Sequence, residues 1–171
     1  MESVEETNTG QSETGFIYPP KYQKPDDTGN ILIKSVASLA IYLIAGYFFF
    51  PSYKILLLVT LVVLIHEMGH FLAMKFYGYN DLGVFFIPLL GAYVSGHKRE
   101  IYQQEFAVII LAGPLPGIII GIILLLISNK NPDTELAGIQ FSQAGLLFML
   151  LNLINLVPVY PLDGGQLLNR V

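Results

Sequence analysis

Two histidines and a glutamate stand together in a long apolar stretch of this 171-residue chain. They belong to the sequence HEMGH (66–70), which lies within residues 55–74, where almost every other residue is hydrophobic. If this stretch is a helix, His66 and His70 lie one turn apart on the same face and can bind one metal ion. Glu67 beside them can accept a proton from a water molecule activated by zinc. The pattern predicts a hydrolytic zinc site inside an apolar helix.

The composition is typical of a membrane protein. The chain is 53% hydrophobic and 13% charged, whereas soluble domains carry about 25% charged residues. The net charge is −4, so no basic surface for nucleic acid is predicted. Because cysteine is absent, disulfides and thiolate ligands are excluded. Any metal must therefore be bound by His, Asp or Glu.

Four apolar segments have the length and composition of transmembrane helices: residues 35–53, 55–74, 106–128 and 141–162. A helix of twenty residues is about 30 Å long, which matches the hydrocarbon core of a bilayer. If the N-terminus is cytoplasmic, seven of the nine Lys and Arg residues lie on the cytoplasmic side. Basic residues favour that side, so we expect a multi-pass integral membrane protein with a cytoplasmic N-terminus.

Residues 84–94 are apolar but contain Pro88 and Gly91, and eleven residues are too short to span a bilayer as a helix. We expect a hairpin dipping into the membrane, because irregular backbone is tolerated there only where protein or a water-lined cavity covers it. The sequence GPLPG (113–117) should kink the third helix and allow close approach of a neighbouring backbone. The predicted fold is an all-α polytopic membrane protein with about four transmembrane helices and a short membrane-embedded β-hairpin.

Residues 1–30 differ from the rest of the chain. They are polar and acidic and contain several prolines, so they cannot bury a core. We expect them to form a disordered N-terminal tail, and residues 31–171 to form the membrane domain.

A catalytic zinc ion usually has three protein ligands, and the histidine pair supplies two. His97 is next to Lys98 and Arg99 and should face water. The remaining acids outside the tail lie mostly in interfacial or loop positions: Glu100, Glu105, Asp133 and Glu135. Asp163 instead follows a long uncharged run and precedes two glycines, and an acid in such a segment marks a functional site. Asp163 is therefore the expected third ligand, although it can also cap a helix over residues 166–171.

Several of these sequences together resemble the site-2 protease family of intramembrane zinc metalloproteases. The HEMGH sequence (66–70) is combined with NLVPVYPLDGG (155–165) in a later apolar segment. The sequence FIPLLGAYV (86–94) is similar to the membrane-embedded hairpin of that family, and AGP (112–114) to its kinked central helix. The resemblance extends over about residues 54–170.

The resemblance implies one zinc ion per chain, bound by His66, His70 and Asp163, with Glu67 as the general base. It implies hydrolysis of peptide bonds in single-span membrane proteins near the cytoplasmic face, in other words regulated intramembrane proteolysis. The lipid bilayer and such a substrate would be the partners of the chain.

The resemblance also implies substrate contacts. Asn155 would lie near the substrate backbone, and residues 84–94, including Gly91 and Tyr93, would pair with an extended segment of the substrate. Two features depart from the family pattern. No asparagine follows shortly after the Gly-Pro pair at 113–114, and family members continue beyond the Asp-Gly-Gly helix. We therefore expect residues 31–171 to be a transmembrane metalloprotease domain truncated at its C-terminus.

Two alternatives remain open from the sequence. The chain can be a zinc-binding membrane protein without proteolysis, either an inactive relative or a metal carrier, since intramembrane His and Asp residues also mark ion pathways. It can also be a structural helix bundle with polar residues packed inside. A metal carrier requires neither Glu67 between the ligands nor a hairpin, so we favour the protease.

Overall fold

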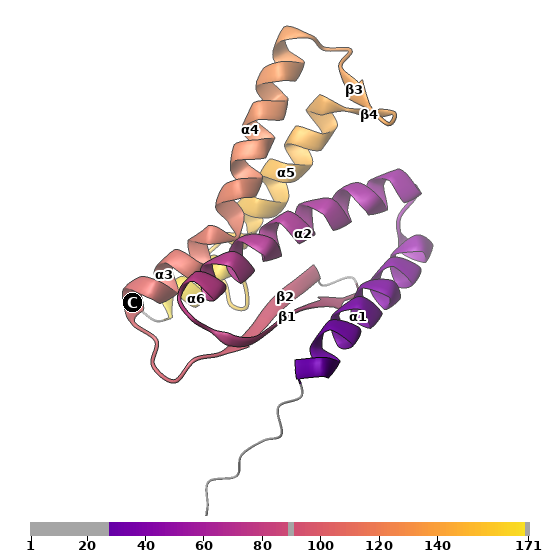
Figure 1. Cartoon of the computed structure of the whole chain (residues 1–171). Helices are drawn as coiled ribbons and strands as arrows, with labels where there is room; N and C mark the ends of the chain where they lie inside the picture. Colours follow the sequence, from indigo (N-terminus) through magenta and orange to yellow (C-terminus); the bar gives the residue numbers. More distant parts are fainter. Residues whose placement is uncertain (1–27, 89–90, 170–171) are drawn as a thin grey trace, which may run out of the picture.

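The computed structural model of the chain describes residues 28–88 and 91–169 (Figure 1). Of the predicted disordered tail, residues 1–27 lie outside the described residues. Residues 28–30 belong to the first helix, and the disordered tail stays a prediction.

Helices dominate the described part of the chain, in the order α1, α2, β1, β2, α3, α4, β3, β4, α5, α6. Their bounds are α1 Thr28–Phe49, α2 Tyr53–Phe76, β1 Asn80–Ile87, β2 Gly91–His97, α3 Gln103–Ala112, α4 Pro114–Lys130, β3 Glu135–Leu136, β4 Ile139–Gln140, α5 Phe141–Asn155 and α6 Asp163–Leu168. Figure 1 shows α4 and α5 side by side, with α2 crossing near their base and the β1–β2 sheet between α2 and α1.

Three helical stretches among the described residues are long and apolar enough to cross a membrane: Asn30–Phe49, Tyr53–Phe76 and Gln103–Lys130. The fourth predicted span, residues 141–162, is shorter than expected because α5 ends at Asn155 after 15 residues. Such a helix is about 22 Å long, less than a bilayer core. Pro158 disfavours helical backbone at the residue before it and lacks an N–H. The count of four spans therefore stays a prediction.

The predicted kink of the third span is present between α3 and α4. Gly113 joins the two helices, and Pro114 opens α4. Proline removes one helical hydrogen bond, and its ring collides with the carbonyl group four residues earlier, so a regular helix cannot continue through this point. The joint lies against α2, which contacts both α3 and α4.

The expected hairpin segment forms a two-stranded antiparallel sheet, with Phe86 opposite Ala92 and Val84 opposite Val94. The strands reach from Asn80 to His97, beyond the predicted residues 84–94. The depth of this sheet in a membrane stays a prediction. Strand β1 packs on α1, and a buried apolar cluster of Tyr42, Leu56 and Phe86 joins α1, α2 and β1.

Candidate metal centre

The two histidines of α2 meet Asp163, the first residue of α6. Their Nε2 atoms are 3.1 Å apart. Asp163 Oδ2 lies 3.1 Å from Nε2 of His66 and 3.3 Å from Nε2 of His70. All three residues are buried. The structure thus brings together the three residues that the sequence predicted as metal ligands, from two elements far apart along the chain.

The donor set fits a zinc ion. A tetrahedral zinc with ligand bonds of 2.0–2.1 Å separates neighbouring ligand atoms by about 3.3 Å, close to the three observed distances. Asp163 Oδ2 is buried and accepts no well-formed hydrogen bond from any described residue. A buried carboxylate oxygen without a donor is costly unless a cation neutralises it. Two imidazoles and one carboxylate are also the ligand types that catalytic zinc takes.

The orientation of His70 is determined by the backbone of α3. Its Nδ1 atom lies 2.8 Å from the carbonyl oxygen of Ile109, in the last turn of that helix. A carbonyl can only accept a hydrogen bond, so Nδ1 carries the proton and Nε2 presents its lone pair to the centre. The last carbonyls of a helix are free to serve such partners. His66 has a corresponding contact, with Nδ1 2.9 Å from Oδ1 of Asn152 on α5.

Glycines allow α2 to approach the α3–α4 joint closely. A Cβ atom on Gly69, inside the HEMGH sequence, would overlap the carbonyl group of Ala112. A Cβ atom on Gly113 would overlap the imidazole ring of His70. The predicted close approach of a neighbouring backbone at residues 113–117 is therefore confirmed, and its partner is the helix that carries the histidines.

The predicted helix after Asp163 begins earlier than expected. It spans Asp163–Leu168, and Leu162 occupies the N-cap position. The alternative role of Asp163 as the N-cap of a helix over residues 166–171 is not observed, because Asp163 is the first helical residue and its side chain faces the histidines. Gly164 and Gly165 pack directly on the backbone of the preceding turn, where a Cβ atom would overlap carbonyl groups. This packing leaves little room for Asp163 to move.

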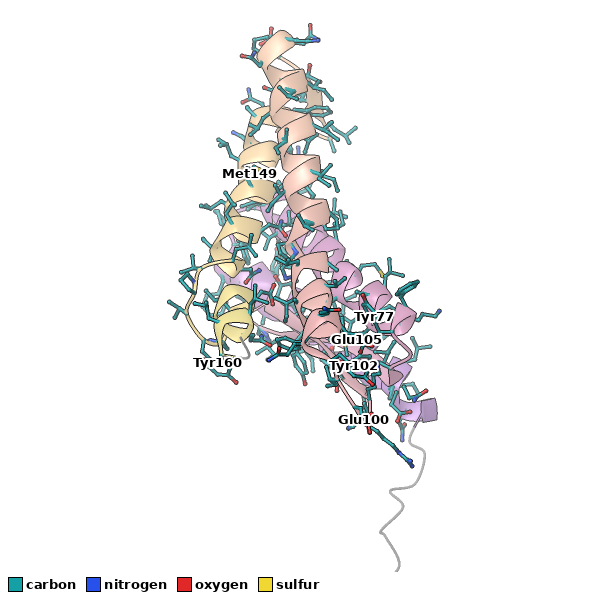
Figure 2. The ribbon with its side chains drawn as sticks, turned by 90° about the vertical axis from the view of Figure 1, so that its left-hand side faces the viewer. Tyr77, Glu100, Tyr102, Glu105, Met149 and Tyr160 are labelled. Atoms are coloured by element: carbon teal, nitrogen blue, oxygen red, sulfur yellow. The ribbon has the colours of Figure 1, made fainter. Side chains whose placement is uncertain are left out.

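The other candidate ligands lie away from this centre. His97 is exposed at the end of β2. The carboxylate of Glu105 pairs with Lys98, whose ammonium group also lies 5.7 Å from the ring centroid of Tyr79. Figure 2 shows Glu105 with Tyr77, Glu100 and Tyr102 at the end of the molecule where α2 ends and α3 begins. The side chains of three further acids are exposed: Glu100, Asp133 and Glu135.

Glu67 is buried, with 6% of its surface exposed, and does not belong to the group of three candidate ligands, His66, His70 and Asp163. The three predicted substrate-binding residues lie in other places. Asn155 is the half-buried last residue of α5, Gly91 opens β2 with φ of 111°, and Tyr93 is 49% exposed and stacks on Phe85. Their roles toward a substrate stay predictions.

Sequence reasoning assigned no role to Asn152 or Ile109. The signal for Asn152 was present, since an amide in an otherwise apolar helix must find a partner. Ile109 contributes a backbone carbonyl, which no residue type reveals. Both were therefore identified only from the structure.

The chain is similar to known proteins over most of this region. A model of peptidase family M50 matches residues 54–140, about half of the chain. The chain is 35% identical over 116 residues to stage IV sporulation protein FB of Bacillus subtilis, covering 67% of this chain and 39% of that protein. It is 32% identical over 116 residues to a zinc metalloprotease of Methanocaldococcus jannaschii, covering 67% and 33%.

A solved structure supports the same relationship. The site-2 protease of Methanocaldococcus jannaschii matches with a TM-score of 0.58 and 29% identity, covering 80% of this chain and 62% of that one. The chain thus spans between about a third and two fifths of the length of the curated relatives named above. Together with the apolar helices, these matches indicate an integral membrane protein. The chain belongs to peptidase family M50, the family of the site-2 zinc metalloproteases.

Proposed function

We propose that the chain is a zinc-dependent intramembrane protease that hydrolyses peptide bonds of transmembrane proteins near the cytoplasmic face. One observation carries this proposal. His66, His70 and Asp163 converge at 3.1–3.3 Å inside an apolar helical protein, around a carboxylate oxygen that lacks a hydrogen-bond donor among the described residues. Burying three ionisable groups without a cation would be strongly unfavourable.

Each group at the site has a chemical role. A zinc ion bound there supplies Lewis-acid chemistry that activates water and polarises the scissile carbonyl. Glu67 follows His66 directly and does not belong to the group of three candidate ligands, so its carboxylate is free to accept the proton of the attacking water. The same carboxylate can then protonate the leaving amine. The low polarity around the site strengthens these charge interactions.

The substrate must be extended at the scissile bond, because the carbonyl groups of a transmembrane helix are hydrogen-bonded and shielded. An open strand edge can hold such a segment through main-chain hydrogen bonds, while alternate side chains enter pockets. We assign this role to β2, the strand that contains Gly91 and Tyr93, whose own backbone groups pair with Ile87 and Phe85 of β1. Asn155 is assigned to the substrate backbone by resemblance to the family.

The choice of β2 over β1 follows from one contact. The N–H of Phe86 in β1 donates a hydrogen bond to Ser38 Oγ of α1 at 3.1 Å, so it points away from β2. In an antiparallel pair, opposite residues either both bond across the pair or both point outward. Ala92 lies opposite Phe86, and Val94 lies two residues further on. The outer edge of β2 therefore carries the N–H groups of Ala92 and Val94.

The orientation of the chain is assigned from its basic residues. With the N-terminus in the cytoplasm, seven of nine Lys and Arg residues lie on that side. His66 is nine residues from Lys75 and twelve from Lys54, so the site lies nearer the cytoplasmic face. Tagging the N-terminus with a reporter that is active only in the cytoplasm tests this assignment.

A Glu67→Gln variant tests the proposed function. We expect it to retain zinc and to lose cleavage of a model single-span substrate by about 10²- to 10⁴-fold, the usual contribution of a general base. Bound metal and cleavage are measured on the purified chain in proteoliposomes. Glu100→Gln, the same change at an exposed position, is the matched control and should leave both unchanged.

Two results would count against the protease. Unchanged cleavage by Glu67→Gln removes the general-base assignment. Zinc flux across the same proteoliposomes without peptide cleavage by the unmodified chain would instead support a metal carrier.

A further inference from the structure

We infer that Asn152 is a positioning residue that holds His66 in the tautomer and ring orientation needed to bind zinc. This inference goes beyond the proposed reaction but rests on the proposed metal site. Asn152 is fully buried, with 0% of its surface exposed, although it lies on an apolar helix. Its side chain connects α5 to the histidine helix α2.

The hydrogen bonds of Asn152 determine which way its amide faces. The Nδ2 group donates to the carbonyl oxygen of Phe148 at 2.7 Å. Rotating the amide by 180° would place Oδ1 against that carbonyl, where two acceptors would repel each other. Oδ1 therefore faces His66, 2.9 Å from Nδ1.

This arrangement determines the protonation of His66. Oδ1 of Asn152 can only accept, so Nδ1 of His66 must carry a proton. A neutral imidazole then has its lone pair on Nε2, the atom that faces His70 and Asp163. An amide that accepts from a metal-ligating histidine in this way fixes the tautomer and increases the basicity of the ligand.

A glycine on α4 makes room for the amide. A Cβ atom on Gly117 would overlap the side chain of Asn152 at Nδ2, Cγ and Oδ1. The amide is thus enclosed between the backbone of α4 and the ring of His66, and it has no space to rotate. Helices α2, α4 and α5 meet at this single side chain.

The two histidines therefore receive the same support from different sources. His70 depends on the carbonyl group of Ile109, which a side-chain substitution does not remove. His66 depends on a side chain, which a substitution does remove. The hydrogen bond between His66 and the metal-site helix α5 can therefore be tested by substituting Asn152.

The test compares Asn152→Leu with Asn152→Asp in the purified full chain. Leucine has a similar volume but no acceptor. A buried aspartic acid keeps the oxygen that faces His66 and, in its protonated form, donates from its other oxygen to the carbonyl group of Phe148. Zinc affinity is measured by competition with a chromogenic chelator. We expect a 10- to 100-fold loss for Asn152→Leu, the usual effect of removing such a partner, and a change of less than about 5-fold for Asn152→Asp. Asn129→Leu, the same change at an exposed position of α4, is the matched control and should keep its zinc affinity.

An unchanged zinc affinity in Asn152→Leu would overturn the inference. An equal loss in the leucine and aspartate variants would also overturn it, because packing alone would then explain the effect. If Asn152→Leu does not fold, the ¹⁵N chemical shifts of the His66 ring in the unmodified metal-free chain decide the question. The Nδ1–H tautomer is expected, and a dominant Nε2–H tautomer would contradict the inference.

These outcomes are separate from the fate of the proposed reaction. Zinc affinity and the histidine tautomer are read without any substrate. If Glu67→Gln retained cleavage, the proposed role of Glu67 would fail while the role of Asn152 could still be confirmed by the metal measurements.

Discussion

Around the metal centre, a glycine of one helix faces the backbone of its neighbour, whereas around the β1–β2 sheet glycines face side chains. We call the first the metal-site region, which comprises the second half of α2, the α3–α4 joint, α5 and α6. We call the second the sheet region, which comprises α1, the first half of α2, β1 and β2. In the metal-site region, Gly69 faces the carbonyl group of Ala112 directly. In the sheet region, Gly46 of α1 faces the methyl groups of Leu56.

This difference indicates how far each region can adjust. A backbone carbonyl has nowhere to move without displacing a helix, while a leucine side chain can adopt another rotamer. The metal-site region therefore holds its ligands within narrow limits, as a preorganised site requires. The sheet region can shift slightly, and it leaves the outer edge of β2 without a strand partner among the described residues.

The largest difference between the regions is expected from matched glycine substitutions. Gly69→Ala should displace α2 from the α3–α4 joint and reduce zinc affinity at least about 5-fold, because overpacking against backbone costs about 1–3 kcal/mol or more. Gly46→Ala should change zinc affinity less than about 2-fold, since Leu56 can reorient. Chelator competition on both variants measures the contrast. Equal losses would show that the two regions are equally rigid.

An intermediate effect is expected from the free edge of β2. Val94→Pro removes an outward N–H without breaking the β1–β2 pairing, and proline is tolerated at such edge positions. One main-chain hydrogen bond to the substrate contributes about 0.5–1.5 kcal/mol, so cleavage efficiency should fall roughly 2- to 10-fold with zinc retained. Val94→Ala keeps the N–H and serves as the control. Full activity of Val94→Pro would exclude this edge as the substrate partner.

The smallest effect is expected from Ser38→Ala. The hydroxyl group accepts the N–H of Phe86 and donates to the carbonyl oxygen of Ser35 at 2.8 Å. Its loss should increase hydrogen exchange at the Phe86 amide and leave cleavage within about 2-fold, because a single hydrogen bond contributes only about 1 kcal/mol. A marked rise in cleavage would instead show that α1 blocks a strand edge that the substrate uses.

Much of the metal site could be predicted from residue types and spacing. His66 and His70 share a helix face because of the helical period, and Glu67 is adjacent to the pair. Asp163 could be predicted as the third ligand because few acids exist in the apolar part of the chain and this one follows a break. The kink at Gly113 and Pro114 followed from the same local rules. All of these depend on interactions close in sequence or on a very short list of candidates.

The sequence by itself determined that the chain is apolar, carries an HEMGH metal motif in a membrane-length helix and offers one suitable acid near its end. Only the tertiary structure decided that α5 ends at Asn155, that Asp163 opens α6, and that Asn152 and Ile109 orient the two histidines. The physical reason is that these features depend on contacts between helices. Which amide or carbonyl group faces an imidazole is set by close packing at glycines such as Gly113 and Gly117, and spacing along one helix carries no record of it.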